Sequence, residues 1–211
     1  RRCMRLPRLL ITPPSVIQAQ SLDLLGIRDW EIVHPSESVR CERLWIPSLL
    51  ARQTVVHPEV PAMLRQAFPA SKAARRRSLY LSRRDAASRR IVNEPALLAA
   101  LPDFELHAAG DLSFQQQVDL FASCERLLAA HGAGMANVVF CPPGARVFEI
   151  YTPLHQVTSM KILSILSGAM HDFVPARNVT FGADGRPLLG DWEVDIEAAV
   201  AVIGQRKSRQ L

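Results

Sequence analysis

Two short segments of this 211-residue chain combine residue types that bind phosphate, and each follows an apolar run. Ser82-Arg83-Arg84 comes after Leu79-Tyr80-Leu81, and His131-Gly132-Ala133-Gly134 comes after Leu127-Leu128-Ala129-Ala130. Arginine makes planar, charge-assisted contacts with phosphate. Glycines allow close backbone approach to an anion, and a helix starting behind them offers unpaired N–H groups. Together the segments predict a site for a phosphorylated ligand.

The glycine turn has a second interpretation. Its GxG spacing lacks the third glycine of a dinucleotide-binding fingerprint, so a tight turn required only for packing explains Gly132 and Gly134 equally well. His131 likewise fits either a structural histidine or a ligand group, because a neutral imidazole can hydrogen-bond a phosphate or a sugar hydroxyl.

Glu149 is a charged residue inside the apolar run Val147-Phe148-Glu149-Ile150. An unpaired carboxylate there would be costly. We expect it either to pair with an arginine or to accept hydrogen bonds from a ligand diol such as ribose. Asn93 and Glu94 are explained by a helix start, with Asn93 as N-cap, and a ligand role for them is secondary.

The elements that must position these residues alternate between strand and helix. Strands are predicted at 78–82, 104–108, 127–130 and 146–150, with helices at 93–101, 113–122 and 135–140 between them. Further along we expect a helix at 155–167, a strand at 171–174, a turn at 183–185 and a helix capped by Asp195. This alternation predicts an α/β fold, a parallel sheet with helices on both faces. Ligands bind such sheets at the carboxyl ends of the strands, so the loops at Ser82, His131 and Glu149 converge if their strands are neighbours.

The first sixty residues contain shorter elements. Strands are expected at Leu9–Ile11, Trp30–Val33 and Arg43–Pro47, and a helix at Ser15–Leu25. We therefore divide the chain into a partial N-terminal Rossmann-like region (1–60), a linker (61–77) and a main Rossmann-like domain (78–211) with a C-terminal helix and the basic tail 206–209.

Composition narrows the function classes. The net charge of +5 comes mainly from arginine, and one group of arginines is crowded into sixteen residues: Arg75, Arg76, Arg77, Arg83, Arg84, Arg89 and Arg90. A solvated basic face, a nucleic-acid patch and a small-molecule phosphate site all fit this group. Against nucleic acid, no aromatic residues are interleaved with the arginines for base stacking.

Several site types are absent from the sequence. It has no P-loop, HExxH, GxSxG or DxD-like pattern, which disfavours nucleotide hydrolases, zinc and serine hydrolases, and metal-dependent transferases. The four cysteines form no CxxC pair, and Cys124 and Cys141 resemble core thiols of a reducing compartment. The longest uncharged stretch, 127–145, contains two prolines and His131, so it is a poor membrane span.

Five segments taken in order resemble glycosyltransferase family 61. They are Leu79 to Asp85, Arg89 to Glu94, Gln117, His131 to Asn137, and Phe148-Glu149-Ile150. The series covers about residues 78 to 151, and Leu24 to Ile27 and Trp45 to Ser48 resemble the preceding region more loosely. The family includes capsule-type enzymes of polysaccharide biosynthesis, plant pentosyltransferases and animal O-linked N-acetylglucosaminyltransferases.

The resemblance implies a GT-B architecture of two facing Rossmann-like halves, whose C-terminal half holds a nucleotide sugar. It implies inverting transfer from a donor such as a UDP-sugar to a glycan or other hydroxyl acceptor, with no cofactor and no obligatory metal. By position, Ser82, Arg83 and Arg84 would face the diphosphate, the turn from His131 through Gly132 and Ala133 to Gly134 would lie beside the donor, and Glu149 would hold the ribose or support the arginines. The matching positions Asn93, Glu94 and Asn137 complete the donor-binding set.

The resemblance also predicts what the chain lacks. The upstream element that would carry the catalytic base is not found, so we expect the base in a missing N-terminal half or a partner chain, with His131 as the remaining candidate here. The alternatives are a non-catalytic nucleotide-sugar-binding fragment and a basic nucleic-acid-binding module; nucleic acid is not the expected partner. The expected location is cytoplasmic, with membrane association left open.

Overall fold

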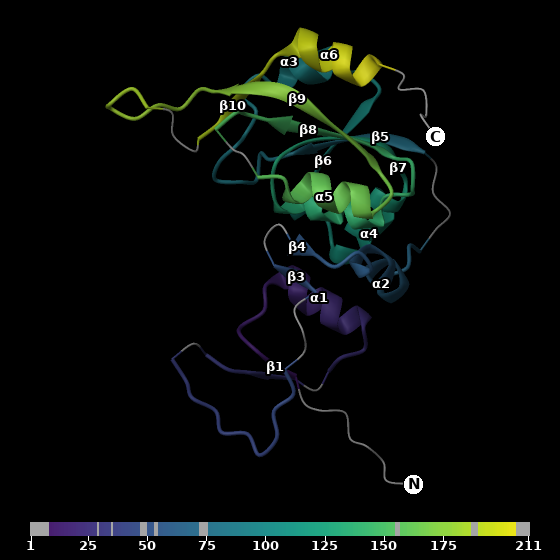
Figure 1. Ribbon diagram of the computed structural model, residues 1–211, viewed down its shortest axis with the longest axis vertical. Coiled ribbons are helices and arrows are strands. Elements are labelled where there is room, and N and C mark those ends of the chain that lie inside the picture. The colour runs from purple at the N-terminus through teal and green to yellow at the C-terminus, as the bar shows by residue number, and fades with distance from the viewer. Residues whose placement is uncertain are drawn as a thin grey trace. The chain divides into compact units, whose positions relative to one another are not determined.

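The computed structural model describes residues 9–28, 30–34, 36–46, 50–52, 55–71, 76–154, 157–186 and 190–205. The chain divides into two compact units, Arg1–Leu49 and Leu50–Leu211 (Figure 1). The predicted boundaries at residues 60 and 77 stay predictions. The basic tail 206–209, Pro47 and His155 lie outside the described residues.

The first unit contains a small β-α-β arrangement. Strand β1 (Leu9–Ile11) pairs in parallel with β2 (Trp30–Ile32), and helix α1 (Val16–Leu24) connects them. Ser15 begins this helix with a reciprocal capping box to Gln18. The strand predicted at Arg43–Pro47 is wrong over its described part, since residues 43–46 are irregular and Trp45 is 71% exposed. A short apolar run does not make a strand without a neighbouring ladder to satisfy its backbone.

A six-stranded sheet forms the centre of the second unit, in the order β10-β9-β8-β7-β5-β6. Its strands are β5 (Arg77–Ser82), β6 (Phe104–Ala108), β7 (Cys124–Ala130), β8 (Arg146–Tyr151), β9 (Met170–Asn178) and β10 (Trp192–Val194). All neighbours are parallel except β9 and β10. The two short strands β3 (Ala51–Arg52) and β4 (Val55–Val56) form a separate antiparallel pair. The predicted α/β class with a mainly parallel sheet is confirmed.

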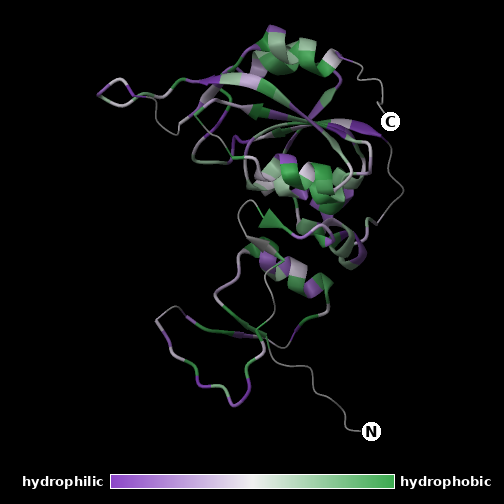
Figure 2. Ribbon diagram, in the orientation of Figure 1, coloured by the Kyte–Doolittle hydropathy of each residue, from purple (hydrophilic) through white to green (hydrophobic). Residues whose placement is uncertain are grey.

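Helices cover both faces of this sheet (Figure 1). One core joins the inward side chains of β5, β7 and β8 to α2 (Val60–Ala67), α4 (Phe114–Ala122), the 3₁₀ helix η2 (Ala133–Phe140) and α5 (Ser159–Leu166). A second core on the opposite face involves α3 (Glu94–Ala100) and α6 (Ile196–Gly204). The central strands are largely apolar (Figure 2), as a sheet buried on both faces requires.

Two of the three helix caps predicted from the sequence are confirmed. Ser113 and Gln116 form the predicted capping box, and Asp195 accepts a hydrogen bond from Ala198 N at 3.0 Å. The third predicted cap is wrong in its detail. Asn93 occupies the N-cap position, but its amide exchanges two hydrogen bonds with the backbone of Val194 (2.8 and 3.0 Å) and thereby holds β10.

Candidate functional site

The loops that follow β5 and β7 meet at one edge of the sheet. The chain runs from β5 outward to β6, then returns to β7 on the other side of β5 and continues to β8 and β9. Strand order thus reverses between β5 and β7, and ligands bind open α/β sheets at the carboxyl ends of such a pair. Because β5, β7 and β8 are direct neighbours, the expected convergence of their loops is confirmed.

The two predicted phosphate-binding segments are in contact. A Cβ atom placed on Gly132 would lie 1.7 Å from Arg83 Nη1 and 2.8 Å from Arg83 Cζ. The guanidinium therefore lies directly over the backbone of the glycine turn. Gly132 has extended φ (172°), so its requirement for glycine is one of space, not of backbone conformation.

A tight turn holds Arg83 in place. Ala86 N donates to Arg83 O at 2.9 Å, and the Arg83 guanidinium donates to Ser88 O from Nε (3.2 Å) and Nη2 (3.1 Å). Asp85 anchors the turn by accepting a hydrogen bond from Gly110 N at 3.0 Å. A side chain at Gly110 would place its Cβ 2.6 Å from Asp85 Oδ2, so this close approach needs glycine.

Two arginines of the loop are close and partly buried. Burial lowers the pKa of Arg83, and the neighbouring Arg89 lowers it further, against the opposing effect of Asp85. Burial also lowers the pKa of Arg89, which adopts a left-handed backbone conformation (φ 61°) uncommon for a residue with a side chain. Two partly desolvated cations held together favour an anion between them. Arg84 differs, since it is exposed and pairs with Asp111 at 2.5 Å.

Ser82 and Glu94 connect β5 to the start of α3. Glu94 Oε1 accepts hydrogen bonds from Ser82 Oγ (2.8 Å) and Tyr80 Oη (2.7 Å), and Arg84 N donates to Ser82 Oγ at 3.1 Å. Burial, with the Glu94 charge, raises the pKa of Tyr80, so its hydroxyl remains a donor. Ser82 and Glu94, both predicted site residues, therefore support the loop after β5 through these hydrogen bonds.

The far side of the glycine turn is held by amides. Asn137 Nδ2 donates to Gln117 Oε1 (2.7 Å) and to Gly134 O (3.2 Å), and Gln117 Nε2 donates to Ala109 O (3.0 Å) and Leu112 O (3.2 Å). The turn and the loop after β6 are thus tied together. Helix η2 begins at Ala133, two residues earlier than predicted, and Ala133 is exposed at its start.

Glu149 has histidine partners in place of the expected arginine. Its side chain has no exposed surface; Oε1 contacts His131 Nδ1, and Oε2 lies 2.9 Å from His171 Nε2, although this second contact is poorly aligned for a hydrogen bond. Burial acts to raise the pKa of Glu149, but the contacts with His131 and His171 outweigh it and lower the pKa. Direct ribose binding by Glu149 stays a prediction, and the geometry favours support of His131.

The buried carboxylate has a testable effect on stability. We expect Glu149→Gln to lower the free energy of unfolding at pH 7 by about 3 kcal/mol, because buried ring N–H groups lose their charged acceptor. A depressed folded pKa stabilises above the ordinary value of 4.5, and this contribution is lost as pH falls below it. Urea denaturation should therefore show the difference between wild type and variant shrinking below pH 4.5. A pH-independent difference would contradict this role.

Acidic partners neutralise much of the arginine group. Arg77 pairs with Glu105, Arg84 with Asp111, and Arg90 with Asp191 at 2.7 Å. Arg83, in contrast to these three arginines, donates its hydrogen bonds to a neutral group, the carbonyl oxygen of Ser88. With these acidic partners, the arginine group does not form a continuous basic face for nucleic acid.

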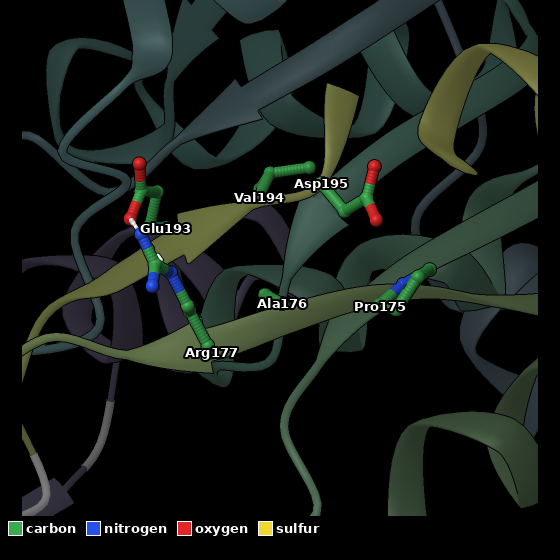
Figure 3. Close-up of a pocket in the computed structure, with 6 residues that line it drawn as sticks. All are labelled: Pro175, Ala176, Arg177, Glu193, Val194 and Asp195. Atoms are coloured by element: carbon green, nitrogen blue, oxygen red, sulfur yellow. Dashed lines mark hydrogen bonds and ion pairs between the residues drawn. The ribbon is translucent and has the colours of Figure 1, made fainter. Parts of the chain in front are cut away.

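A hollow of about 410 Å³ lies elsewhere, between β9 and β10 (Figure 3). Its lining residues are Pro175, Ala176, Arg177, Glu193, Val194 and Asp195. Arg177 and Glu193 pair with each other across it, and Asp195 is engaged as the cap of α6. Its polar groups are satisfied internally and none belongs to the loops after β5 and β7, so we place the functional site at those two loops.

Comparison with known proteins decides the family. The sequence pattern described as Glycosyltransferase 61 matches residues 3–148, which include the loop after β5, the glycine turn and Asn137. The chain belongs to glycosyltransferase family 61. The match ends one residue before Glu149, so the matched region does not include Glu149 or His171.

A curated relative supports the same family. Protein O-linked-mannose beta-1,4-N-acetylglucosaminyltransferase 2 of Takifugu rubripes is 31% identical over 99 residues, which cover 43% of this chain. These residues span 17% of that relative's length. No helix in the described part of this family 61 chain is long and apolar enough to cross a membrane.

Sequence reasoning missed His171 and gave Arg89 no role of its own. His171 is separated by one residue from Phe173 on β9, and strand alternation would have placed both on the face that Glu149 occupies. Arg89 carried no local signal, because its backbone N–H donates to Gly190 O, a residue about a hundred positions away along the chain.

Proposed function

We propose that the loops after β5 and β7 bind the diphosphate of a nucleotide sugar, and that the chain is the donor-binding part of a glycosyltransferase. One observation carries this proposal. The Arg83 guanidinium lies over Gly132 at the reversal of strand order, beside a second partly buried arginine, Arg89. A diphosphate supplies the anion that this arrangement favours, and the backbone of the turn lies beneath it.

The same arginines suit the leaving group of glycosyl transfer. Negative charge develops on the diphosphate as the bond to the sugar breaks, and fixed cations in a partly desolvated site stabilise that charge. We therefore propose a GT-B enzyme that transfers a sugar from a UDP-sugar with inversion and without a metal ion. Arg83 and Arg89 would stabilise the charge on the leaving diphosphate, as a divalent ion does in other transferases.

The acceptor and the biological setting also belong to the proposal. The relative's name describes N-acetylglucosamine transfer to O-linked mannose, which supports a glycan hydroxyl as acceptor here. Polysaccharide biosynthesis, such as that of a capsule, is one setting for such a transfer. The free cysteines Cys41, Cys124 and Cys141 support a cytoplasmic location, where thiols remain reduced.

Calorimetric titration of the 211-residue chain with UDP, GDP, CMP and NAD tests the proposal. We expect UDP to bind, and Arg84→Ala to weaken it only a few-fold, because Arg84 is exposed and already paired with Asp111. Absence of binding by either diphosphate, UDP or GDP, at low salt would contradict the donor site. Steeply salt-dependent binding of RNA that UDP does not displace would favour the nucleic-acid alternative.

A further inference from the structure

The buried polar contacts of Glu149 continue to two residues outside the predicted site. His171 on β9 has no exposed side-chain surface, and its Nδ1 lies 3.0 Å from Ser164 Oγ on α5. Ser164 is also buried, and its Oγ lies 2.7 Å from Met160 O, so its single proton is shared between two acceptors, that carbonyl and His171 Nδ1. These contacts join four side chains into one row of buried polar groups that starts at the glycine turn: His131, Glu149, His171 and Ser164.

Packing fixes the plane of the His171 ring. Phe173 meets it edge to face, with ring centroids 5.0 Å apart and an interplanar angle of 72°. The Lys161 ammonium of α5 lies 5.6 Å from the centroid of the Phe173 ring. His171 is thus held by an aromatic ring, a carboxylate and a hydroxyl, which leaves little freedom for its two nitrogens to exchange places.

The positions of the protons follow from the carboxylate. An ionised Glu149 only accepts hydrogen bonds, so His131 Nδ1, which is hydrogen-bonded to Oε1, carries a proton. His171 Nε2 lies 2.9 Å from Oε2 in a poorly aligned contact, and a proton on this nitrogen avoids placing its lone pair against the carboxylate. When the His131 ring is neutral, Nε2 is then its acceptor nitrogen. A hydroxyl of a sugar or ribose is the kind of group that such a nitrogen receives.

We propose that His171 is a positioning residue for the donor site: it holds the Glu149 carboxylate so that His131 keeps its proton on Nδ1 and its acceptor nitrogen at Nε2. The proposal rests on the proposed function, since it assigns His131 to the donor. Ser164 completes the arrangement when its hydroxyl donates to His171 Nδ1, because the single proton of a neutral His171 ring then lies on Nε2, the nitrogen that faces Glu149.

Two matched variants test this proposal. In His171→Asn the shorter amide lies where Nδ1 lies and does not reach Glu149, whereas the His171→Gln amide reaches the Nε2 position. Nitrogen-15 shifts of the His131 ring report its tautomer without any ligand. We expect the Nδ1–H tautomer in wild type and His171→Gln, and its loss in His171→Asn together with roughly 3- to 30-fold weaker UDP binding.

The outcomes separate this inference from the proposed function. If wild type does not bind UDP, the donor site is wrong, and the His131 tautomer alone decides the role of His171. An unchanged tautomer in folded His171→Asn overturns the positioning role, as does a His171→Gln variant no better than His171→Asn. Should His171→Asn not fold, Ser164→Ala replaces it: a shift of the His131 tautomer in the same direction supports the role, and an unchanged tautomer overturns it.

Discussion

Arg83→Ala is expected to weaken UDP binding roughly 10- to 100-fold, the loss that follows when a partly desolvated, charge-assisted contact is removed. The residue combines the features that make such a contact strong. Its guanidinium lies over Gly132, it is fixed by two hydrogen bonds to Ser88 O, and Arg89 adds positive charge nearby. Calorimetry with UDP measures the change.

Arg177→Ala is the matched control. It removes the same charge from an exposed arginine that pairs with Glu193 at the hollow in Figure 3, so its UDP affinity should equal that of wild type. Equal losses of UDP affinity in the two variants would mean that the net charge of the protein, and not the site at Arg83 and Gly132, drives binding. An Arg83→Ala variant that binds as well as wild type would remove the residue from the site.

Gly132→Ala should weaken UDP binding almost as much as Arg83→Ala, although it adds only one methyl group. The new Cβ would lie 1.7 Å from Arg83 Nη1, and the guanidinium must move because it is the flexible partner. Since Gly132 has extended φ, alanine fits the backbone, and stability should change little. The two losses have one cause, so the double variant should bind no worse than Arg83→Ala alone.

Gly204→Ala provides the control for this substitution, because a Cβ there meets nothing within 4 Å. It should leave UDP affinity unchanged. If the Gly132→Ala and Arg83→Ala losses instead add in the double variant, the two residues act independently, and the contact between them does not position the guanidinium.

The parts of the site that were predictable are those encoded locally. The apolar runs at Leu79–Leu81 and Leu127–Ala130 marked strands, and a parallel sheet brings the ends of neighbouring strands together. The convergence of the loops at Ser82 and His131 was expected from that rule on condition that their strands are neighbours; the contact of Arg83 with Gly132 was not predicted. Ser113 and Asp195 were equally local, since a cap needs only its own first helical turn.

The features that could not be predicted from the sequence depend on partners that are distant along the chain. Asn93 looked like a cap, but the backbone of Val194 competes for its amide. Glu149 clearly needed a partner, yet only the register between β8 and β9 identifies His171 as one. Arg43 to Ile46 had strand-like residues, and no local rule reveals whether a ladder is there to pair with them.

The central claim is that a diphosphate binds where Arg83 meets the glycine turn. Backbone amide NMR of the nitrogen-15-labelled chain tests it most directly, by comparing UDP with uridine, which lacks the phosphates. We expect UDP to shift the amide signals of Gly132 and Gly134 and the Arg83 Nε–H signal, and uridine to leave them largely unchanged. Shifts from UDP that avoid these three signals, or that cluster around Arg177 and Glu193, would contradict it.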